Sequence, residues 1–183
     1  DAGELIRIAN YKYPRGQIPI PGFVGGPCLS KDGIFLDNNT TFSSIVSTAW
    51  KLNESIPQHI VNNIKKISGN LVGKKIAILG LSFKSGSDDL RNSPSVKLVE
   101  TLKDTGAEVL VHDPYVKNTD GLLDVLKSPD VVIIATNHKD FLNNISEIKN
   151  SGATIIYDVW SMFKKEDFEG LKFLKFGEGT DFQ

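Results

Sequence analysis

The residues of this 183-residue chain that are best suited to chemistry lie in one short stretch, GGPCLSKD, residues 25–32. The stretch holds the single cysteine, Cys28, with Lys31 three positions later and Asp32 four positions later. If it begins a helical turn, all three side chains share one face, because residues three and four apart are neighbours on a helix. Lys31 would then favour the thiolate, and Asp32 could position or activate a water molecule. The spacing is thus compatible with a cysteine nucleophile.

A structural cysteine is the alternative. Free cysteine is among the most buried residue types and then behaves as a small apolar side chain. A carboxylate beside a thiol also disfavours the thiolate, so the trio makes sense mainly if Asp32 acts on water. Spacing alone favours the structural interpretation of Cys28, and the nucleophile stays open as the second one.

A second stretch with chemical potential, GLSFKSGSDDLR, follows an apolar run and begins at Gly80. A dinucleotide-binding domain would carry G-x-G-x-x-G at this place, but Gly80 is followed by Leu81, Ser82 and Phe83. The usual pyrophosphate turn therefore cannot form there in its usual way.

The same stretch offers other ligand-binding groups. Lys84 and Arg91 suit phosphate, and the ring of Phe83 can stack on a base or a sugar. The alternative is a solvated loop in which Asp88 and Asp89 form local ion pairs with Arg91. The spacing leaves both interpretations open.

The histidines point to no metal site. His59, His112 and His138 are scattered and show no spacing such as H-E-x-x-H, so we interpret them as structural or surface residues. Asp113 ends a predicted strand, where a dinucleotide-binding unit would place its ribose-binding acid. Without the glycine turn we predict instead that Asp113 and Pro114 form a turn.

The elements that must position these residues alternate between strand and helix in the second part of the chain. Short apolar runs are typical of strands buried on both faces. Ser93 and Pro94 suit the start of a helix and Gly106 suits its end. The pattern predicts an α/β fold, with a Rossmann-like parallel sheet covered by helices on both faces and ligands at the carboxyl ends of the strands. The predicted strands are 75–83, 107–114, 130–136, 154–160 and 171–176, and the predicted helices are 93–106, 121–127 and 140–150.

The first part of the chain predicts helices around a loop. A helical pattern opens residues 1–12, and residues 13–27 hold four prolines and four glycines, which predict a structured loop. Apolar spacing over 40–67 predicts two helices or one strongly kinked helix, with a junction near Pro57. Their wide apolar faces need a partner, and we predict a homodimer. Two glycines and two lysines in 68–75 mark a boundary that divides the chain into 1–73, a helical dimerisation segment, and 74–183.

Composition narrows the function classes. The chain is 40% hydrophobic and 23% charged, which is ordinary for a folded protein. Its net charge of -1 gives no basic field for nucleic acid or an anionic membrane. No apolar run reaches membrane-spanning length, and no leader is visible. One cysteine cannot form an internal disulfide, which fits a cytoplasmic location. Because the chain begins with Asp1, we expect a fragment or a processed product.

The two stretches together resemble the UDP-glucose/GDP-mannose dehydrogenase family. GGPCLSKD is similar to the family's catalytic segment Gly-Gly-x-Cys-x-x-Lys-Asp. KKIAILGLSFKSGSDDLRNSPSVKLVETLKDTGAEVLVHDPYV is similar to the start of its C-terminal nucleotide-sugar domain, and DVVIIATNHKDF to a later strand and turn. The resemblance covers residue 1 to about residue 176. ANYKYPRGQIPIPGFVGGPC is closer to the UDP-N-acetylhexosamine branch, especially the N-acetylmannosamine dehydrogenases, than to UDP-glucose enzymes.

The resemblance implies a three-part protein, of which this chain matches the central helical segment and the C-terminal UDP-sugar domain. The NAD-binding N-terminal domain and the family's catalytic lysine and asparagine are not in the matched region, so the chain alone is expected to be inactive. The implied reaction oxidises C6 of a UDP-sugar to the uronic acid with NAD, through a thiohemiacetal and a thioester on the cysteine. Cys28 would be the nucleophile, Asp32 would assist acid–base steps, and Lys31 and Arg91 would contact NAD.

The resemblance also implies a substrate site. Phe83 and Lys84 would contact the UDP-sugar, and the loop 19–25 would bind the diphosphate by backbone amides. Arg15 would be donated across a dimer. The residues of that loop expected to contact the substrate are Phe23, Val24 and Gly25.

The sequence departs from the family pattern in two places. Phe23 and Val24 stand where the family usually has a further glycine, so the sugar pocket is expected to differ. Glu178 stands where the family often has a substrate-binding arginine, which weakens the expected diphosphate contacts. UDP-glucose 6-dehydrogenase, and a non-catalytic nucleotide-sugar binding or dimerisation module, stay open as alternatives. A start codon near Asp1 would favour the module, and an upstream G-x-G-x-x-G would favour the dehydrogenase.

Overall fold

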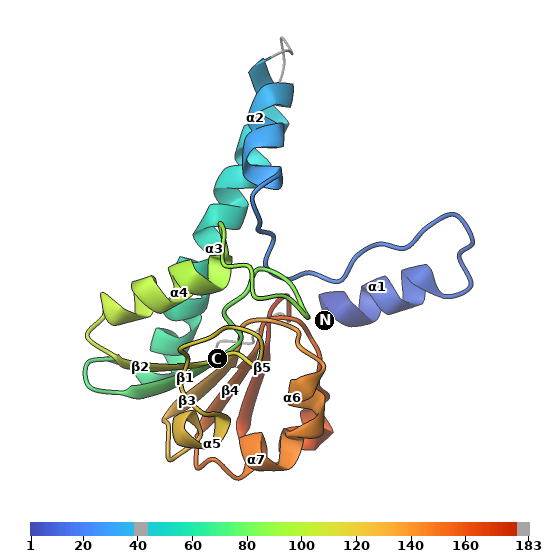
Figure 1. Cartoon of the computed structure of the whole chain (residues 1–183). Coiled ribbons are helices and arrows are strands. Elements are labelled where there is room, and N and C mark those ends of the chain that lie inside the picture. Colours follow the sequence, from blue (N-terminus) through green and yellow to red (C-terminus); the bar gives the residue numbers. More distant parts are fainter. Residues whose placement is uncertain (39–43, 179–183) are drawn as a thin grey trace.

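The computed structural model describes residues 1–38 and 44–178 and contains one parallel sheet with helices on both faces (Figure 1). The strands are β1 (Lys75–Leu79), β2 (Glu108–His112), β3 (Val131–Ile134), β4 (Ile155–Asp158) and β5 (Lys172–Lys175). The helices are α1 (Ala2–Asn10), α2 (Leu29–Asn38), α3 (Ser44–Ser68), α4 (Pro94–Lys103), α5 (Leu122–Val125), α6 (Asp140–Asn143) and α7 (Ile145–Lys149), with a 3-10 helix η1 (Lys165–Phe168).

The strand order is β2-β1-β3-β4-β5, and every neighbouring pair is parallel. Side chains alternate between the two faces, as the two-residue period of a strand requires. In β1, Ile76 and Ile78 face one apolar cluster, and Ala77 and Leu79 face the other. The predicted α/β fold with a parallel sheet is confirmed.

Helices cover both faces, as predicted. On one face, Ile60 and Ile64 of α3 pack with Leu98 of α4 beneath the sheet. On the other face, α5, α7 and η1 contribute Val125, Ile148 and Phe168. The second half of α3 thus belongs to the core of the sheet. The proposed division of the chain at residues 73 and 74 stays a prediction.

The boundaries of several elements differ from the sequence pattern. Strand β1 ends at Leu79 because Gly80 turns the chain with φ +95°. The helix predicted over 140–150 is two short helices that meet at Asn144. The pattern missed η1, whose four residues are too few to give a period.

Two features project from the sheet (Figure 1). We call α2 together with residues 44–55 of α3 the stalk, and α1 together with residues 11–20 the arm. Helix α3 is a single helix with Pro57 inside it, so the alternative of two separate helices is wrong, whereas the strong kink stays a prediction; residues 40–43 of that prediction lie outside the described residues. Within the described part of the chain, no helix is both long and apolar enough to span a membrane.

Candidate functional site

Cys28 lies directly before α2, with an exposed thiol. The backbone N–H groups of Lys31 and Asp32 donate to the Cys28 carbonyl at 3.1 and 2.9 Å, so the predicted helical turn is present. Because the Cys28 thiol is exposed, the alternative of a buried cysteine is wrong. The unpaired N–H groups of a helix start favour negative charge nearby, which suits a thiol that must act as a thiolate.

The two glycines before Cys28 pack against the loop that follows β1. The N–H of Gly26 donates to the Asn92 carbonyl at 3.2 Å. A Cβ on Gly25 would lie 2.6 Å from that same oxygen, and a Cβ on Gly26 would lie 2.9 Å from the ring of Phe83. The glycines thus allow two segments far apart in the sequence to meet beside Cys28.

Phe83 and Lys84 lie together on the loop after β1. The Lys84 Nζ lies 5.5 Å from the centroid of the half-buried Phe83 ring, within cation–π distance. The N–H of Phe83 donates to the Asp89 carbonyl at 3.1 Å, which closes the loop. The apolar ring of Phe83 and the exposed ammonium of Lys84 thus lie next to each other.

Arg91 forms the local ion pair that the alternative interpretation of this loop predicted. Its Nη2 lies 2.7 Å from Asp89 Oδ2, and this contact lowers the pKa of Asp89 to about 2. The pKa of Arg91 is raised, first by its hydrogen bond to Asp89, next by the charge of that carboxylate, and to a smaller extent by Cys28 when it is a thiolate. The Arg91 side chain is still 71% exposed. A cation with free surface therefore lies within electrostatic reach of the thiol.

Phe23 and Val24 have different surroundings. The ring of Phe23 is only 4% exposed and belongs to the core that α3 and α4 share with the sheet. The Val24 N–H donates to Asn53 Oδ1 at 3.3 Å, and its carbonyl accepts from Asn53 Nδ2 at 2.7 Å. Asn53 of α3 thus holds the Cys28 segment, and the Val24 amide already has a partner. The sequence did not predict this role of Asn53, because it is one of several polar residues in an amphipathic helix.

Arg15 lies outside this group of residues. It is exposed in the arm, which extends away from the sheet (Figure 1). Asn10 closes the arm by donating to the Ile18 carbonyl and accepting from the Ile18 N–H, both at 2.8 Å. Lys31 is exposed on α2. The structure thus brings Cys28, Phe83 and Arg91 to one region and leaves Arg15 apart.

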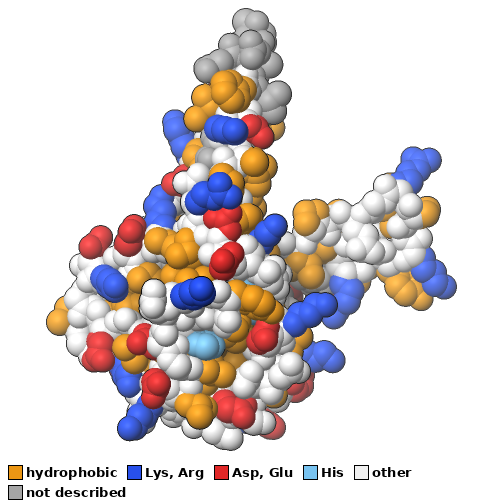
Figure 2. Space-filling model, viewed as in Figure 1, with side chains coloured by type: hydrophobic (Ala, Val, Ile, Leu, Met, Phe, Trp, Pro, Cys, Tyr) orange, Lys and Arg blue, Asp and Glu red, His pale blue; other side chains and the backbone are white. Residues whose placement is uncertain are grey.

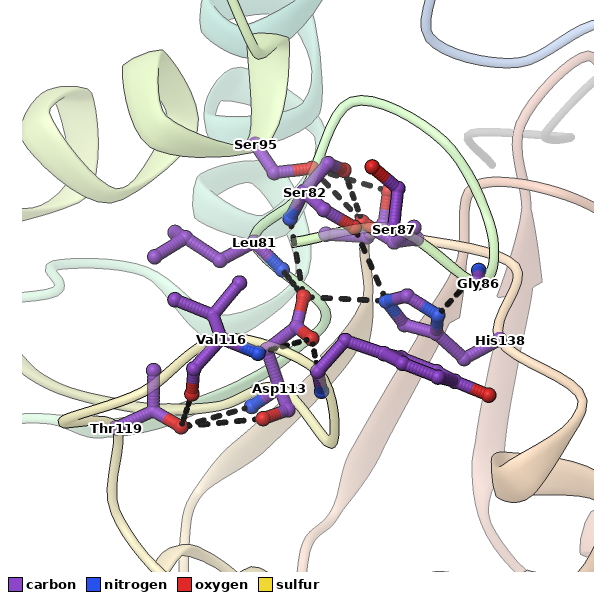
Figure 3. A network of polar contacts seen from close by, with 12 residues as sticks. Leu81, Ser82, Gly86, Ser87, Ser95, Asp113, Val116, Thr119 and His138 are labelled. Carbon is purple, nitrogen blue, oxygen red and sulfur yellow. Dashed lines mark hydrogen bonds and ion pairs between the residues drawn. The ribbon is translucent and has the colours of Figure 1, made fainter. Parts of the chain in front are cut away.

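A buried polar network at the carboxyl ends of β1, β2 and β3 lies beneath the loop (Figure 3). Asp113 Oδ2 accepts from the N–H groups of Leu81 and Ser82 at 2.7 and 3.0 Å. Its Oδ1 accepts from the N–H groups of Tyr115 and Val116 at 2.9 and 3.2 Å, so the predicted turn at Asp113 is present. One side chain therefore orders the loops after two neighbouring strands.

His138 joins the same network and has no exposed surface. Its Nε2 lies 3.1 Å from Asp113 Oδ2 and 3.2 Å from Ser82 Oγ, and its Nδ1 accepts from the Gly86 N–H at 3.2 Å. Burial raises the pKa of Asp113, but the hydrogen bonds from His138, Leu81 and Ser82 outweigh burial and hold that pKa well below its usual range. The sequence interpretation of His138 as structural or surface thus resolves to a fully buried position.

A second buried carboxyl, Asp158, ends β4. Its oxygens accept from the N–H groups of Trp160 and Phe163, each at 2.9 Å. Burial nevertheless raises the pKa of Asp158 to about 6.

The loop after β1 does not fit the pyrophosphate of a dinucleotide. The amides of Leu81 and Ser82, which would face such a ligand, already donate to Asp113. A Cβ on Gly80 would lie 2.4 Å from the Thr136 Cβ, so the turn is packed against the neighbouring strand. Across residues 1–38 and 44–178, no three His, Cys, Asp or Glu side chains are grouped so that they could hold a metal ion.

Comparison with protein families gives a match over residues 77–166, to the UDP-binding domain of the UDP-glucose/GDP-mannose dehydrogenase family. A UDP-N-acetyl-D-mannosamine dehydrogenase of Methanocaldococcus jannaschii is 35% identical over 97% of this chain. One from Pyrococcus horikoshii is 38% identical over 75% of the chain. The chain covers 44% and 34% of these two proteins, so it spans less than half the length of the curated relatives that it matches.

Solved structures agree with these matches. The UDP-D-ManNAc dehydrogenase of Pyrococcus horikoshii superimposes with a TM-score of 0.82 at 35% identity, over 94% of this chain and 43% of that one. An NDP-N-acetyl-D-galactosaminuronic acid dehydrogenase of Methanosarcina mazei gives a TM-score of 0.82 at 26% identity, over 96% and 43%.

Proposed function

Since this chain belongs to the UDP-glucose/GDP-mannose dehydrogenase family, we propose that it forms the cysteine-bearing and UDP-sugar-binding part of an NAD-dependent nucleotide-sugar 6-dehydrogenase. The proposed substrate is UDP-N-acetyl-D-mannosamine, which the names of the two archaeal relatives support.

The observation that carries the proposal is the meeting of the Cys28 segment with the loop after β1. The exposed thiol lies at a helix start, two residues after the glycine that touches the ring of Phe83. A UDP-sugar held by Phe83 and Lys84 would have its base or sugar against the ring and its diphosphate beside the ammonium. Its far end, the hexose, would then extend toward Cys28.

Cys28 is the proposed nucleophile. Its sulfur adds to the C6 aldehyde to give a thiohemiacetal, and after the second oxidation it holds C6 as a thioester. Asp32, exposed one helical turn further along α2, assists the proton transfers and the attack of water that releases the acid. Covalent attachment keeps the reactive carbon in the site between the two oxidations.

NAD, when bound, accepts a hydride at each oxidation. The loop after β1 does not fit its pyrophosphate, so we propose that this chain contacts the cofactor only from the Cys28 side. Arg91 has the exposed cationic surface for this contact, and Lys31 lies on the turn that Cys28 begins. We also propose that acid formation needs a longer protein than these 183 residues, which their share of the length of the relatives supports.

The stalk is the proposed homodimer surface. Large apolar side chains are exposed on it, and several are visible along its surface among charged ones (Figure 2). A groove of about 550 Å³ between the two helices is lined mainly by apolar side chains, Trp50 and Val46 among them. The exposed residues are Leu29, Ile34, Phe35, Ile45 and Leu52.

Calorimetric titration of this chain tests the binding half of the proposal. The ligands are UDP, UDP-glucose and UDP-N-acetyl-D-mannosamine, with NAD as a separate titrant. We expect UDP-sugar binding, strongest for the N-acetylated sugar, and little affinity for NAD. A matched pair of variants, Lys84→Ala and the exposed Lys117→Ala, separates a contact with the ligand from a loss of net charge. Equal affinity in both variants would contradict the assignment of Lys84.

A further inference from the structure

The loop after β1 is held at two points on either side of the proposed UDP contacts. Phe83 and Lys84 lie between Ser82 and Gly86, and we call residues 82–86 the contact loop. At its first end, the Ser82 N–H donates to Asp113 and the Ser82 carbonyl accepts from Thr136 Oγ1 at 2.7 Å. At its second end, the Gly86 N–H donates to His138 Nδ1 at 3.2 Å.

The partners of His138 determine which ring nitrogen carries the proton. A backbone N–H can only donate, so Nδ1 must accept from Gly86 and cannot itself be protonated. The proton then lies on Nε2, which faces the Asp113 carboxylate at 3.1 Å. The Ser82 hydroxyl donates its own hydrogen to the Lys84 carbonyl at 3.0 Å, so toward His138 its oxygen acts as an acceptor. The Nε2–H thus has two acceptors, the Asp113 carboxylate and the Ser82 hydroxyl.

Two aromatic side chains pack against this ring. The ring centroid of Tyr115 lies 4.9 Å from that of His138 with an interplanar angle of 32°, and the ring centroid of Phe141 lies 5.6 Å from it in a T-shaped arrangement at 77°. The Tyr115 hydroxyl donates to Asp140 Oδ2 at 3.0 Å, which ties that ring down in turn. The imidazole thus packs with two rings and makes polar contacts through both of its nitrogens.

We propose that His138, as the neutral Nε2–H tautomer, is a positioning residue that anchors the contact loop and thereby holds Phe83 against Gly26 beside Cys28. One ring nitrogen binds the carboxylate that orders the start of the loop, and the other binds the amide at its end. The imidazole therefore fixes the distance between the two ends of the segment that carries Phe83 and Lys84. The effect on UDP affinity rests on the proposed function, whereas the anchoring of the loop does not.

The first experiment uses the wild-type chain. Nitrogen NMR of the histidine rings at neutral pH should report His138 with a proton on Nε2 and an unprotonated Nδ1. An Nδ1–H tautomer or a doubly protonated ring would overturn the proposal, because neither could accept from Gly86.

The second experiment uses two variants that each keep one half of the imidazole. His138→Asn places an oxygen near the position of Nδ1 and keeps an acceptor for Gly86. His138→Gln places its amide nitrogen near Nε2, which keeps a donor to Asp113 but loses that acceptor. His59→Gln, on the exposed surface of α3, is the matched control.

Amide hydrogen exchange and UDP titration give the readouts. Exchange at Gly86 should quicken about tenfold in His138→Gln and much less in His138→Asn and the control, since the lost hydrogen bond no longer opposes opening. UDP affinity should fall about three- to tenfold in His138→Gln. Equal exchange at Gly86 in both His138 variants would overturn the anchoring.

Two further outcomes remain decisive. If both His138 variants lose their circular dichroism signal, the tautomer of the wild-type ring decides the proposal. If the wild-type chain does not bind UDP, the proposed function fails, and the tautomer and exchange results still decide whether His138 anchors the loop.

Discussion

Cys28 is exposed yet lies among groups that suit a reactive thiol. It lies directly before a helix, and the guanidinium of Arg91 is near enough that a thiolate at Cys28 would help to raise the Arg91 pKa. An unused surface cysteine would need neither the two glycines that let the loops meet nor a neighbouring cation.

Replacing Cys28 tests its role directly. In the longer protein proposed above, Cys28→Ser should lower the proposed uronic acid formation at least about a thousandfold, because a neutral hydroxyl is a far weaker nucleophile than a thiolate. UDP-sugar binding, measured by calorimetry, should change less than about threefold. Unchanged turnover would refute the nucleophile.

The close contact at Gly26 gives a second test. Gly26→Ala should weaken UDP binding, because its Cβ would lie 2.9 Å from the Phe83 ring. Gly69→Ala is the matched control, since Gly69 also has a positive φ but nothing lies within 4 Å of its added Cβ. Both variants should lose about 1 to 2 kcal/mol of unfolding free energy from backbone strain, measured in urea. Equal UDP affinity in the two variants would show that the contact with Phe83 does not matter for binding.

Among the elements, α3 holds the Cys28 segment with its first half and packs against the sheet with its second half. Asn53 holds both polar groups of the Val24 backbone. About two and three turns later, Ile60 and Ile64 are fully buried against the sheet. The position of the thiol relative to the sheet thus depends on this helix as well as on the loop contacts.

Asn53→Ala should release the Cys28 segment. Two hydrogen bonds of about 0.5 to 1.5 kcal/mol each are lost, so hydrogen exchange at Val24 should quicken about tenfold. Asn62→Ala, on the exposed face of the same helix, is the control and should leave that exchange unchanged. Equal exchange in both variants would mean that the segment is held elsewhere.

The sequence predicts most of the sheet because its strands are buried on both faces and read as apolar runs, as in Val131–Ile134. The spacing places Cys28 and Asp32 on one helical face, but the nucleophile is predicted only by the resemblance of GGPCLSKD to the family's catalytic segment. It could not predict Asn53 or the linkage of Asp113 to His138, because these contacts join residues far apart in the chain. Periodicity reports which face of an element is apolar and carries no information about which polar side chains meet after folding.

For the whole molecule, the exposed apolar stalk favours association. Leu52→Glu should shift the protein toward monomer in sedimentation velocity, because a charge placed in an apolar interface would lose its water. Leu123→Glu, at a similarly exposed leucine on α5, is the matched control. An unchanged sedimentation coefficient in Leu52→Glu would exclude Leu52 from the dimer surface.

The two buried carboxyls give opposite dependences of stability on pH. Asp113 has a lowered pKa in the folded state, so its contribution is present above about pH 4 and is lost as the pH falls. Asp158 has a raised pKa of about 6, so the folded state binds its proton more tightly, and stability falls as the pH rises from about 4 to 6.

Asp158→Asn should remove the second dependence. Urea unfolding at pH 4, 5, 6 and 7 should show that the wild type loses about 2 to 3 kcal/mol more than the variant over this range. The exposed Asp88→Asn separates the buried carboxyl from a simple change in net charge. Parallel curves for the wild type and Asp158→Asn would contradict the raised pKa.

Because α3 is one continuous helix, the rotation of its first half about the helix axis also determines how the Cys28 segment is oriented. The segment before Cys28 is tied to α3 through Asn53 and to the loop after β1 through Asn92. One residue inserted after Ser55 would turn the first half of the helix by about 100° and shift it by about 1.5 Å relative to the second. Both halves could still fold, but the two ties would then point in different directions. Along this helix we therefore expect Asn62→Ala to leave the site intact, whereas a change of length between Asn53 and Ile60 should disrupt it.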